Sequence, residues 1–324
     1  MTEQEIKTKI IPLARGIADE VKKAVIGKDD IVIKTLLAII AGGHILLDDI
    51  PGVGKTTLAV AFSKAMSLDY KRMQFTPDVL PADVTGFTVY NKQTGSFEYK
   101  PGAALCSLFL ADEINRTSSK TQSALLEAME EGAVTVDGVT HPLPKPFIVI
   151  ATQNPIGSVG TQMLPESQLD RFIVRLTMGY PDLESEIAIL KSKSPSNAAD
   201  AISPAADGDG VLMLRSAAEE VFIDDKVYRY LASIAAATRS HPQVKLGLSP
   251  RGTVALTSMA RAAALMKGRS YVIPDDVKYI LSDVAEHRMI LNAKAKAAGV
   301  TAADVLKDIS ARTPAPKIQE KRSV

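Results

Sequence analysis

The stretch LLDDIPGVGKTTLA, residues 46–59, combines three consecutive elements of local structure. Its apolar start is typical of a β-strand, its glycine-containing centre of a tight turn, and its end of the first turn of a helix. Gly52 and Gly54 let the backbone bend and approach a bound group closely, and N–H groups at a helix start form an anion-binding concavity. The stretch therefore predicts a phosphate-binding loop, with Lys55 facing the β- and γ-phosphates and Thr56 as a Mg²⁺ ligand.

This loop departs from the pattern GxxxxGK[ST] at the first position, where Asp49 replaces glycine. We expect that the backbone needs no positive φ at this position. A chance glycine turn before a helix is the alternative, but strand, turn, Lys-Thr pair and amphipathic helix follow in the right order. Pro51, Val53 and Thr57 complete the predicted nucleotide-binding segment.

A second candidate site lies in CSLFLADEINR, residues 106–116, an apolar run that ends in two acids. A run that is apolar on both faces is typical of a central parallel strand. Asp112 then lies at the carboxyl end of that strand, facing the phosphate loop, where it can organise Mg²⁺. Glu113 beside it can polarise an attacking water. Acids often simply end strands, so this assignment depends on the upstream loop.

Composition limits the other possibilities. The 324 residues suggest about two domains, and 38 Lys and Arg against 37 Asp and Glu leave no global field that attracts nucleic acid or acidic lipid. Cys106 is the only cysteine, which excludes an intrachain disulfide framework, and the four histidines show no ligand spacing. The polar N-terminus is unlike a signal peptide, and the most apolar stretch is too short to span a membrane. We therefore expect a cytoplasmic protein without a structural metal.

The periodicity along the chain predicts an α/β domain followed by a helical one. Polar residues end the apolar strands, and parallel strands bind ligands at their carboxyl ends, so the predicted loop, the acids and Asn154 should meet in one site. The expected elements are helices at 4–24, 29–41, 118–131 and 164–172, strands at 44–47, 71–75, 106–112, 147–155 and 172–178, and β-hairpins at 83–102 and 131–144.

Composition changes near residue 191. The expected organisation is an α/β domain over 1–190, an exposed linker over 191–210, a helical lid over 211–292 and a fraying tail over 293–324. The lid helices are expected at about 211–220, 224–240, 250–267 and 274–290.

At these residues the chain resembles an AAA+ ATPase, and specifically the MoxR family. The resemblance extends over about residues 10–290 and is carried by IPGVGKTT, LFLADEINRTSSKTQSALLEAMEE, ATQNP, LPESQLDRF and LSPRG. The order and intervals of the last three motifs are far more specific than the phosphate loop. The resemblance implies a P-loop AAA+ core with a parallel sheet, inserted β-hairpins and a small all-helical lid domain.

The resemblance also implies residue roles. Asn154 matches sensor 1, Arg171 an arginine finger that reaches the neighbouring subunit, and Arg251 sensor 2. Arg116 either acts across a subunit interface or forms a structural salt bridge. The adenine-pocket segment matches VIGK and supplies Val25, Ile26 and Gly27.

The function implied by the resemblance is Mg²⁺- and ATP-dependent, chaperone-like remodelling of partner proteins, with metal-cofactor insertion as a narrower version. It implies a homo-oligomeric ring, with six subunits as the family expectation, and a separate protein partner, such as one with a von Willebrand-type metal-binding domain. A nucleic-acid motor of the same clade is the first alternative, which the absence of a basic stripe disfavours. A nucleotide-dependent module that does not hydrolyse is the second, which Glu113 and Arg171 disfavour.

Overall fold

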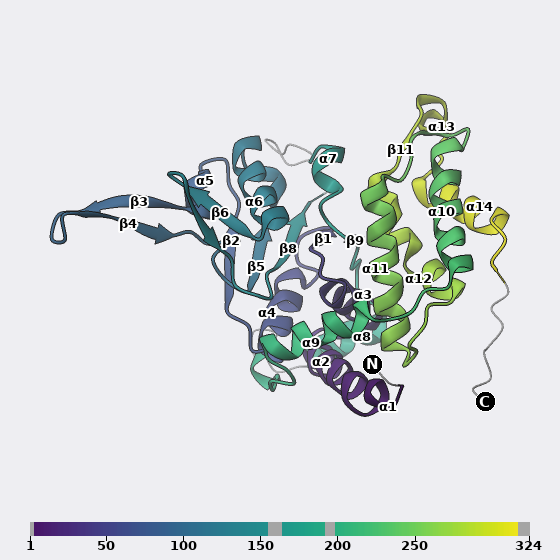
Figure 1. The fold of residues 1–324 in the computed structure, drawn as a ribbon, viewed down its shortest axis with the longest axis horizontal. Helices are drawn as coiled ribbons and strands as arrows, with labels where there is room; N and C mark the ends of the chain where they lie inside the picture. Colours follow the sequence, from purple (N-terminus) through teal and green to yellow (C-terminus); the bar gives the residue numbers. More distant parts are fainter. Residues whose placement is uncertain (1–2, 155–163, 192–197, 317–324) are drawn as a thin grey trace. The chain divides into compact units, whose positions relative to one another are not determined.

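The computed structural model describes residues 3–154, 164–191 and 198–316, which form two compact units (Figure 1). One unit comprises residues 13–213, and the other comprises residues 1–12 and 214–324. The division falls inside helix α9 (Gly208–Glu219). This helix starts within the stretch 191–210 that the sequence predicts to be a linker, so the linker prediction is wrong at its C-terminal end. Residues 192–197 of that stretch lie outside the described residues.

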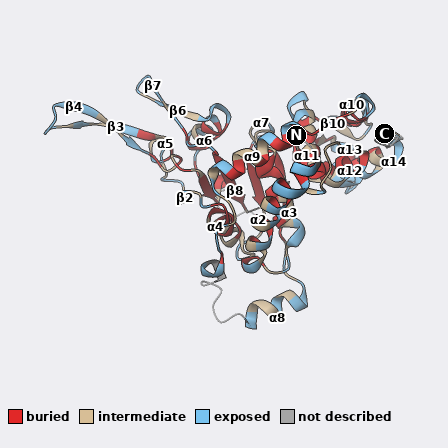
Figure 2. Ribbon diagram, turned by 60° about the horizontal axis from the view of Figure 1, so that its bottom comes forward, coloured by how far each residue is buried: buried red, intermediate tan, exposed pale blue. Residues whose placement is uncertain are grey.

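A parallel sheet forms the centre of the first unit. Its described strands follow the order β2-β5-β8-β1-β9. Their bounds are β1 (Ile45–Asp48), β2 (Tyr70–Gln74), β5 (Leu108–Asp112), β8 (Ile148–Gln153) and β9 (Val174–Leu176). All residues of β5 and β8 are buried, as expected for central strands covered on both faces, whereas β2 is a partly exposed edge (Figure 2). The predicted strands are therefore confirmed.

Helices flank this sheet (Figure 1). The helices of this part of the chain are α2 (Ile11–Ala24), α3 (Asp29–Ile40), α4 (Lys55–Ala65), α5 (Pro81–Thr85), α6 (Ser119–Glu131), α7 (Glu166–Leu169) and α8 (Leu183–Lys191), of which α8 projects away from the sheet (Figure 2). The helix predicted at 4–24 starts as α1 (Glu3–Glu5) and passes through a π-helical turn at Ile6–Ile10 before α2. Helix α8 was not predicted, and none of its residues is buried.

Both predicted β-hairpins are present. Strands β3 (Gly86–Asn91) and β4 (Ser96–Pro101) form the longer hairpin, and β6 (Ala133–Val136) and β7 (Val139–Pro142) form the shorter one. The longer hairpin extends away from the sheet (Figure 1). Its Tyr99 ring stacks on His141 of the shorter hairpin, with 3.7 Å between ring centroids. The two insertions therefore support each other at their bases.

The second unit is mainly helical. Its elements after α9 are α10 (Asp225–Ser240), β10 (Val244–Leu246), α11 (Pro250–Met266), α12 (Pro274–Ala285), β11 (Ile290–Leu291), α13 (Ala293–Ala297) and α14 (Ala302–Arg312). The short antiparallel pair of β10 and β11 was not predicted.

The fraying tail predicted for residues 293–324 is wrong for its first part. Helix α14 starts with a capping box between Thr301 and Asp304 and buries Val305, Leu306 and Ile309. Apolar burial and a capped first turn order this segment. Residues 317–324 lie outside the described residues. None of the described helices is long and apolar enough to cross a membrane.

Candidate active site

The candidate site is a cavity at the carboxyl ends of the sheet strands. Asp112 of β5 pairs in register with Gln74 of β2, and Asp48 of β1 with Gln153 of β8, so the strand ends lie at one level. The cavity has a volume of about 390 Å³. It is lined by Pro51, Gly52, Gly54, Lys55, Thr56, Thr57, Arg72, Gln74, Asp112, Glu113 and Asn154. The predicted phosphate loop, acidic pair and Asn154 therefore come together, as strand-end placement requires.

The phosphate loop has the backbone conformation that its glycines predict. Gly52 and Gly54 have φ values of 86° and 96°, in the region that disfavours residues with a Cβ. A Cβ on Gly52 would contact nothing within 4 Å, so the dihedral angle and not the space requires glycine there. Gly54 caps α4, and the helix starts at Lys55. The N-terminal N–H groups of α4 thus belong to the cavity wall.

Lys55 provides positive charge within this wall. Its Nζ donates to the backbone carbonyls of Asp49 and Ile50, at 2.5 and 3.2 Å. Burial lowers the pKa of Lys55, while the nearby carboxylates of Asp49, Asp112, Glu113 and Asp48 oppose this shift. A polyanionic ligand would give this partly desolvated ammonium the counter-charge that the carboxylates only partly supply.

Asp49 lies where the phosphate-loop pattern has glycine, and its side chain makes structural contacts. Its φ is not among the positive values of the chain, which agrees with the expectation from the sequence. The buried carboxylate accepts hydrogen bonds from the N–H groups of Ile50, at 2.8 Å, and Gly179, at 2.6 Å. Asp49 therefore ties the start of the phosphate loop to the chain that follows β9.

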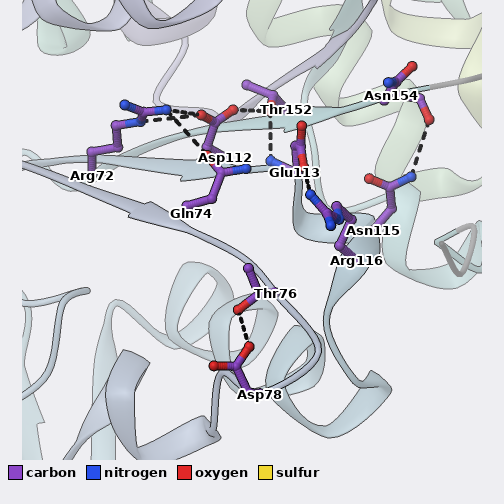
Figure 3. A network of polar contacts seen from close by, with 10 residues as sticks. All are labelled: Arg72, Gln74, Thr76, Asp78, Asp112, Glu113, Asn115, Arg116, Thr152 and Asn154. Atoms are coloured by element: carbon purple, nitrogen blue, oxygen red, sulfur yellow. Dashed lines mark hydrogen bonds and ion pairs between the residues drawn. The ribbon is translucent and has the colours of Figure 1, made fainter. Parts of the chain in front are cut away.

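Asp112 is held by two partners (Figure 3). The Arg72 guanidinium donates to Oδ2 from Nη2 at 2.6 Å and from Nε at 3.2 Å, while the Thr152 hydroxyl donates to Oδ1 at 2.6 Å. Arg72 Nη2 also donates to Gln74 Oε1, at 3.2 Å. The carboxylate is therefore fixed in orientation and electrostatically compensated.

Glu113 has an unusual backbone for a residue with a side chain. Its φ of 56° and ψ of 49° lie in the left-handed region, and its N–H donates to Thr152 Oγ1 at 2.8 Å. Its carboxylate Oε2 lies 2.7 Å from Nη1 of Arg116 in the same chain. The sequence left open whether Arg116 acts across a subunit interface or forms a structural salt bridge. The structure contains a salt bridge, and its partner Glu113 lines the cavity.

Asn154 lies in the cavity wall beyond the end of β8. Its backbone carbonyl accepts a hydrogen bond from the fully buried Asn115, at 3.3 Å (Figure 3). This contact links the segment after β8 to the segment after β5. The amide of Asn154 therefore belongs to the same site as the acidic pair.

The other predicted site residues lie elsewhere. The cavity lining does not include Val25, Ile26 or Gly27, and Gly27, with a φ of 72°, lies against Ser185 of α8. Arg171 does not line the cavity either, and its Nε lies 3.2 Å from Glu130 Oε2 on α6. Arg251 is exposed on the first turn of α11, in the other unit. The roles of these residues remain predictions.

Sequence reasoning missed three polar side chains of the site. Arg72 and Gln74 lie two residues apart on β2 and therefore on one face of the strand. The alternation of polar side chains along this strand was the only sequence signal that Arg72 and Gln74 share one face. Thr152 is a single hydroxyl in an apolar strand, which resembles ordinary strand composition, so its bridge between Asp112 and Glu113 had no signal in the sequence.

Comparisons with known proteins agree with this geometry. Residues 44–174 match the profile of the ATPase family associated with various cellular activities, and residues 236–309 match the AAA lid domain. A Bacillus subtilis protein named YeaC is 47% identical over 94% of this chain and 95% of its own length. The chaperone MoxR1 of Mycobacterium tuberculosis is 36% identical over 92% of this chain and 81% of its own length.

A solved structure is similar throughout. The crystal structure of a candidate ATPase from Cytophaga hutchinsonii has a TM-score of 0.89 and 36% sequence identity, and the match covers 97% of this chain and 98% of that chain. Together with the phosphate loop, the acidic pair and the helical unit, these relationships establish the family. The chain belongs to the MoxR family of AAA+ ATPases, with a P-loop α/β core and a helical lid.

Proposed function

We propose that the chain hydrolyses ATP with the help of Mg²⁺ and uses the reaction to remodel a partner protein. The observation that carries this proposal is the single cavity that Lys55, Thr56, Asp112, Glu113 and Asn154 line together. It offers a cation and backbone donors for phosphates beside a pair of carboxylates and an amide. Phosphoryl transfer to water needs such groups because it depends on positioning and charge compensation.

The residues present fit a magnesium ion. The Thr56 hydroxyl and the Asp112 carboxylate are hard oxygen donors on one cavity wall. Within the described parts of the chain no three His, Cys, Asp or Glu side chains gather to hold a metal by themselves. When bound, Mg²⁺ neutralises charge on the phosphate oxygens.

Different residues of the chain bind the phosphates, activate the attacking water and orient it. Lys55 and the N–H groups at the start of α4 bind the β- and γ-phosphates. Glu113 accepts a proton from the attacking water, and Asn154 orients that water. Lys55→Ala should therefore weaken ATP binding severely, whereas Glu113→Gln should bind ATP normally and release phosphate slowly. Binding titrations and a phosphate-release assay test this, and unchanged ATP affinity in Lys55→Ala would reject the phosphate-loop assignment.

We also propose that the active form is a ring in which Arg171 acts on the neighbouring subunit's nucleotide. The match of Arg171 in LDRF to the family's arginine finger supports this assignment. An arginine finger contributes about 10³–10⁵ in rate. Specific ATPase activity should thus rise with protein concentration, and Arg171→Ala should lower turnover while preserving ATP binding. Activity independent of concentration, from dilute subunits to the assembled state, would contradict the trans-acting role.

The remodelling output rests on the family and on the exposed hairpins. The relative from Mycobacterium tuberculosis is named a chaperone, and Tyr90 and Phe97 are exposed on the longer hairpin. We propose that a separate protein with a von Willebrand-type metal-binding domain binds this chain more tightly in the ATP state. Pull-downs with Glu113→Gln, with and without ATP, test this. Recovery of nucleic acid alone would favour the motor alternative.

A further inference from the structure

Arg72 binds one carboxylate oxygen of Asp112, and both residues line the same cavity. Two N–H groups of its guanidinium converge on the single oxygen Oδ2, at 2.6 and 3.2 Å (Figure 3). The Asp112 side chain is only 11% exposed, while the Arg72 side chain is 46% exposed and lines the cavity. The contact therefore joins a fixed carboxylate to a side chain with access to solvent.

The acceptor capacity of Asp112 is nearly used up by these contacts. A carboxylate offers about four lone-pair positions, two on each oxygen. Arg72 takes both positions on Oδ2, and the Thr152 hydroxyl takes one on Oδ1. One position remains for any further donor or cation. A hydrated Mg²⁺ therefore competes with Arg72 for Oδ2.

The Arg72 contact also differs from a structural ion pair of the same chain. Arg269 binds both oxygens of Asp276 in the other unit, where the Asp276 side chain is fully buried and the Arg269 side chain is 19% exposed. A pair with one half-exposed partner is weaker, because water and salt screen it. Arg72 can therefore leave Asp112 at a cost that a stronger ligand can supply.

We propose that Arg72 is the resident cation of the magnesium subsite, which neutralises Asp112 in the nucleotide-free protein and leaves it when Mg²⁺ and ATP bind. The displaced guanidinium stays at the wall of the same cavity, where phosphate oxygens match its planar set of donors. The proposal rests on the proposed function, and it gives Arg72 a positioning role.

The test uses the metal alone, without nucleotide, on the full-length protein. Mn²⁺ replaces Mg²⁺ because electron paramagnetic resonance counts free Mn²⁺ directly. Arg72→Ala should bind one Mn²⁺ at least about tenfold more tightly than the wild type, the factor expected once a charge-assisted hydrogen bond no longer competes. The variant should also melt at a lower temperature than the wild type, and metal should raise its melting temperature more.

Three further variants locate the effect. Adding Asp112→Asn to Arg72→Ala should abolish the gained Mn²⁺ site, and Arg72→Lys should restore wild-type behaviour in part. Arg312→Ala removes an exposed arginine pair with Asp308 and should leave metal binding unchanged. Equal Mn²⁺ affinity in Arg72→Ala and the wild type, or no Mn²⁺ binding by Arg72→Ala, would overturn the proposal. If Arg72→Ala does not fold, Arg72→Gln provides the same comparison.

Failure of the proposed function gives a different result. Absent ATP binding by the wild type would reject that function, whereas the Mn²⁺ comparison reads only the competition at Asp112. ATP titrations of the wild type with Mg²⁺ and with a chelator therefore accompany the test. Normal ATP binding together with unchanged Mn²⁺ affinity in Arg72→Ala would leave the proposed function standing and remove Arg72 from it.

Discussion

Replacement of Thr152 by valine removes one hydroxyl from the centre of the site and changes little else. Thr152 is fully buried on β8, and valine has nearly the same shape. The hydroxyl accepts the N–H of Glu113 at 2.8 Å and donates to Asp112 Oδ1 at 2.6 Å. Thr152→Val therefore leaves a backbone donor and a carboxylate oxygen without these partners.

The expected cost follows from these two hydrogen bonds. A buried group left unsatisfied costs about 1–3 kcal/mol, and a hydrogen bond to a charged group contributes about 1.5–3 kcal/mol. Because one relaxation partly relieves both losses, we expect the free energy of unfolding to fall by about 2–4 kcal/mol. The left-handed backbone conformation of Glu113 costs about 1–2 kcal/mol, and in Thr152→Val it loses the hydrogen bond to the Thr152 hydroxyl that helps to hold it.

Two assays measure the consequences. Urea unfolding followed by circular dichroism reports the stability loss, and steady-state phosphate release reports turnover. Because a displacement of about 1 Å can cost 10²-fold in rate, turnover should fall by roughly 10- to 100-fold with ATP affinity little changed. Thr152→Ser keeps the hydroxyl and should retain most turnover, and Thr135→Val removes an exposed hydroxyl as a control. A Thr152→Val protein with wild-type stability and turnover would refute the bridging role.

Three further predictions concern a charge, a contact and a helix. Burial lowers the pKa of Lys55, and bound phosphates would raise it, so ATP affinity should fall as the pH rises past the lowered pKa. ATP titrations of the wild type at increasing pH should show this fall, whereas the affinity of Lys55→Arg should not change over the same range. Arg116→Ala should release Glu113 and raise turnover by up to about fivefold, whereas a large fall would favour action across the subunit interface. Leu306→Ala should lower the free energy of unfolding in urea by about 2–4 kcal/mol, and a negligible change would favour the expectation that this segment frays.

The candidate site was predictable because most of its residues follow each other locally. Gly52, Gly54, Lys55 and Thr56 occupy one turn and one helix start, so their spacing alone fixes their relation. Asp112 follows directly after a strand that is apolar on both faces. The rule that parallel strands place their carboxyl ends together then joins these distant segments.

Contacts that depend on strand pairing were not predictable in this way. Arg72 reaches Asp112 because β2 pairs with β5 in a register that sets Gln74 opposite Asp112. A sequence without strand order does not contain that register. The bridge through Thr152 likewise depends on the pairing of β5 with β8.

Helices α8 and α14 were missed for opposite reasons. Helix α8 has no buried residue, so it lacks the apolar stripe by which helices are identified. Helix α14 does carry a signal, since Thr301 and Asp304 form a capping box before Val305, Leu306 and Ile309. The polar residues around it outweighed that signal and favoured a tail.

The most direct test of the proposed ATPase is the single-turnover rate of ATP hydrolysis in wild type and Glu113→Gln, both saturated with ATP and Mg²⁺. Glu113 lines the cavity and is assigned to accept the proton of the attacking water. A general base contributes about 10²–10⁴ in rate, so the variant should hydrolyse bound ATP at least about 100-fold more slowly at unchanged ATP affinity. Equal hydrolysis rates in the two proteins, or none in the assembled wild type, would contradict the assignment of this cavity as an ATPase site.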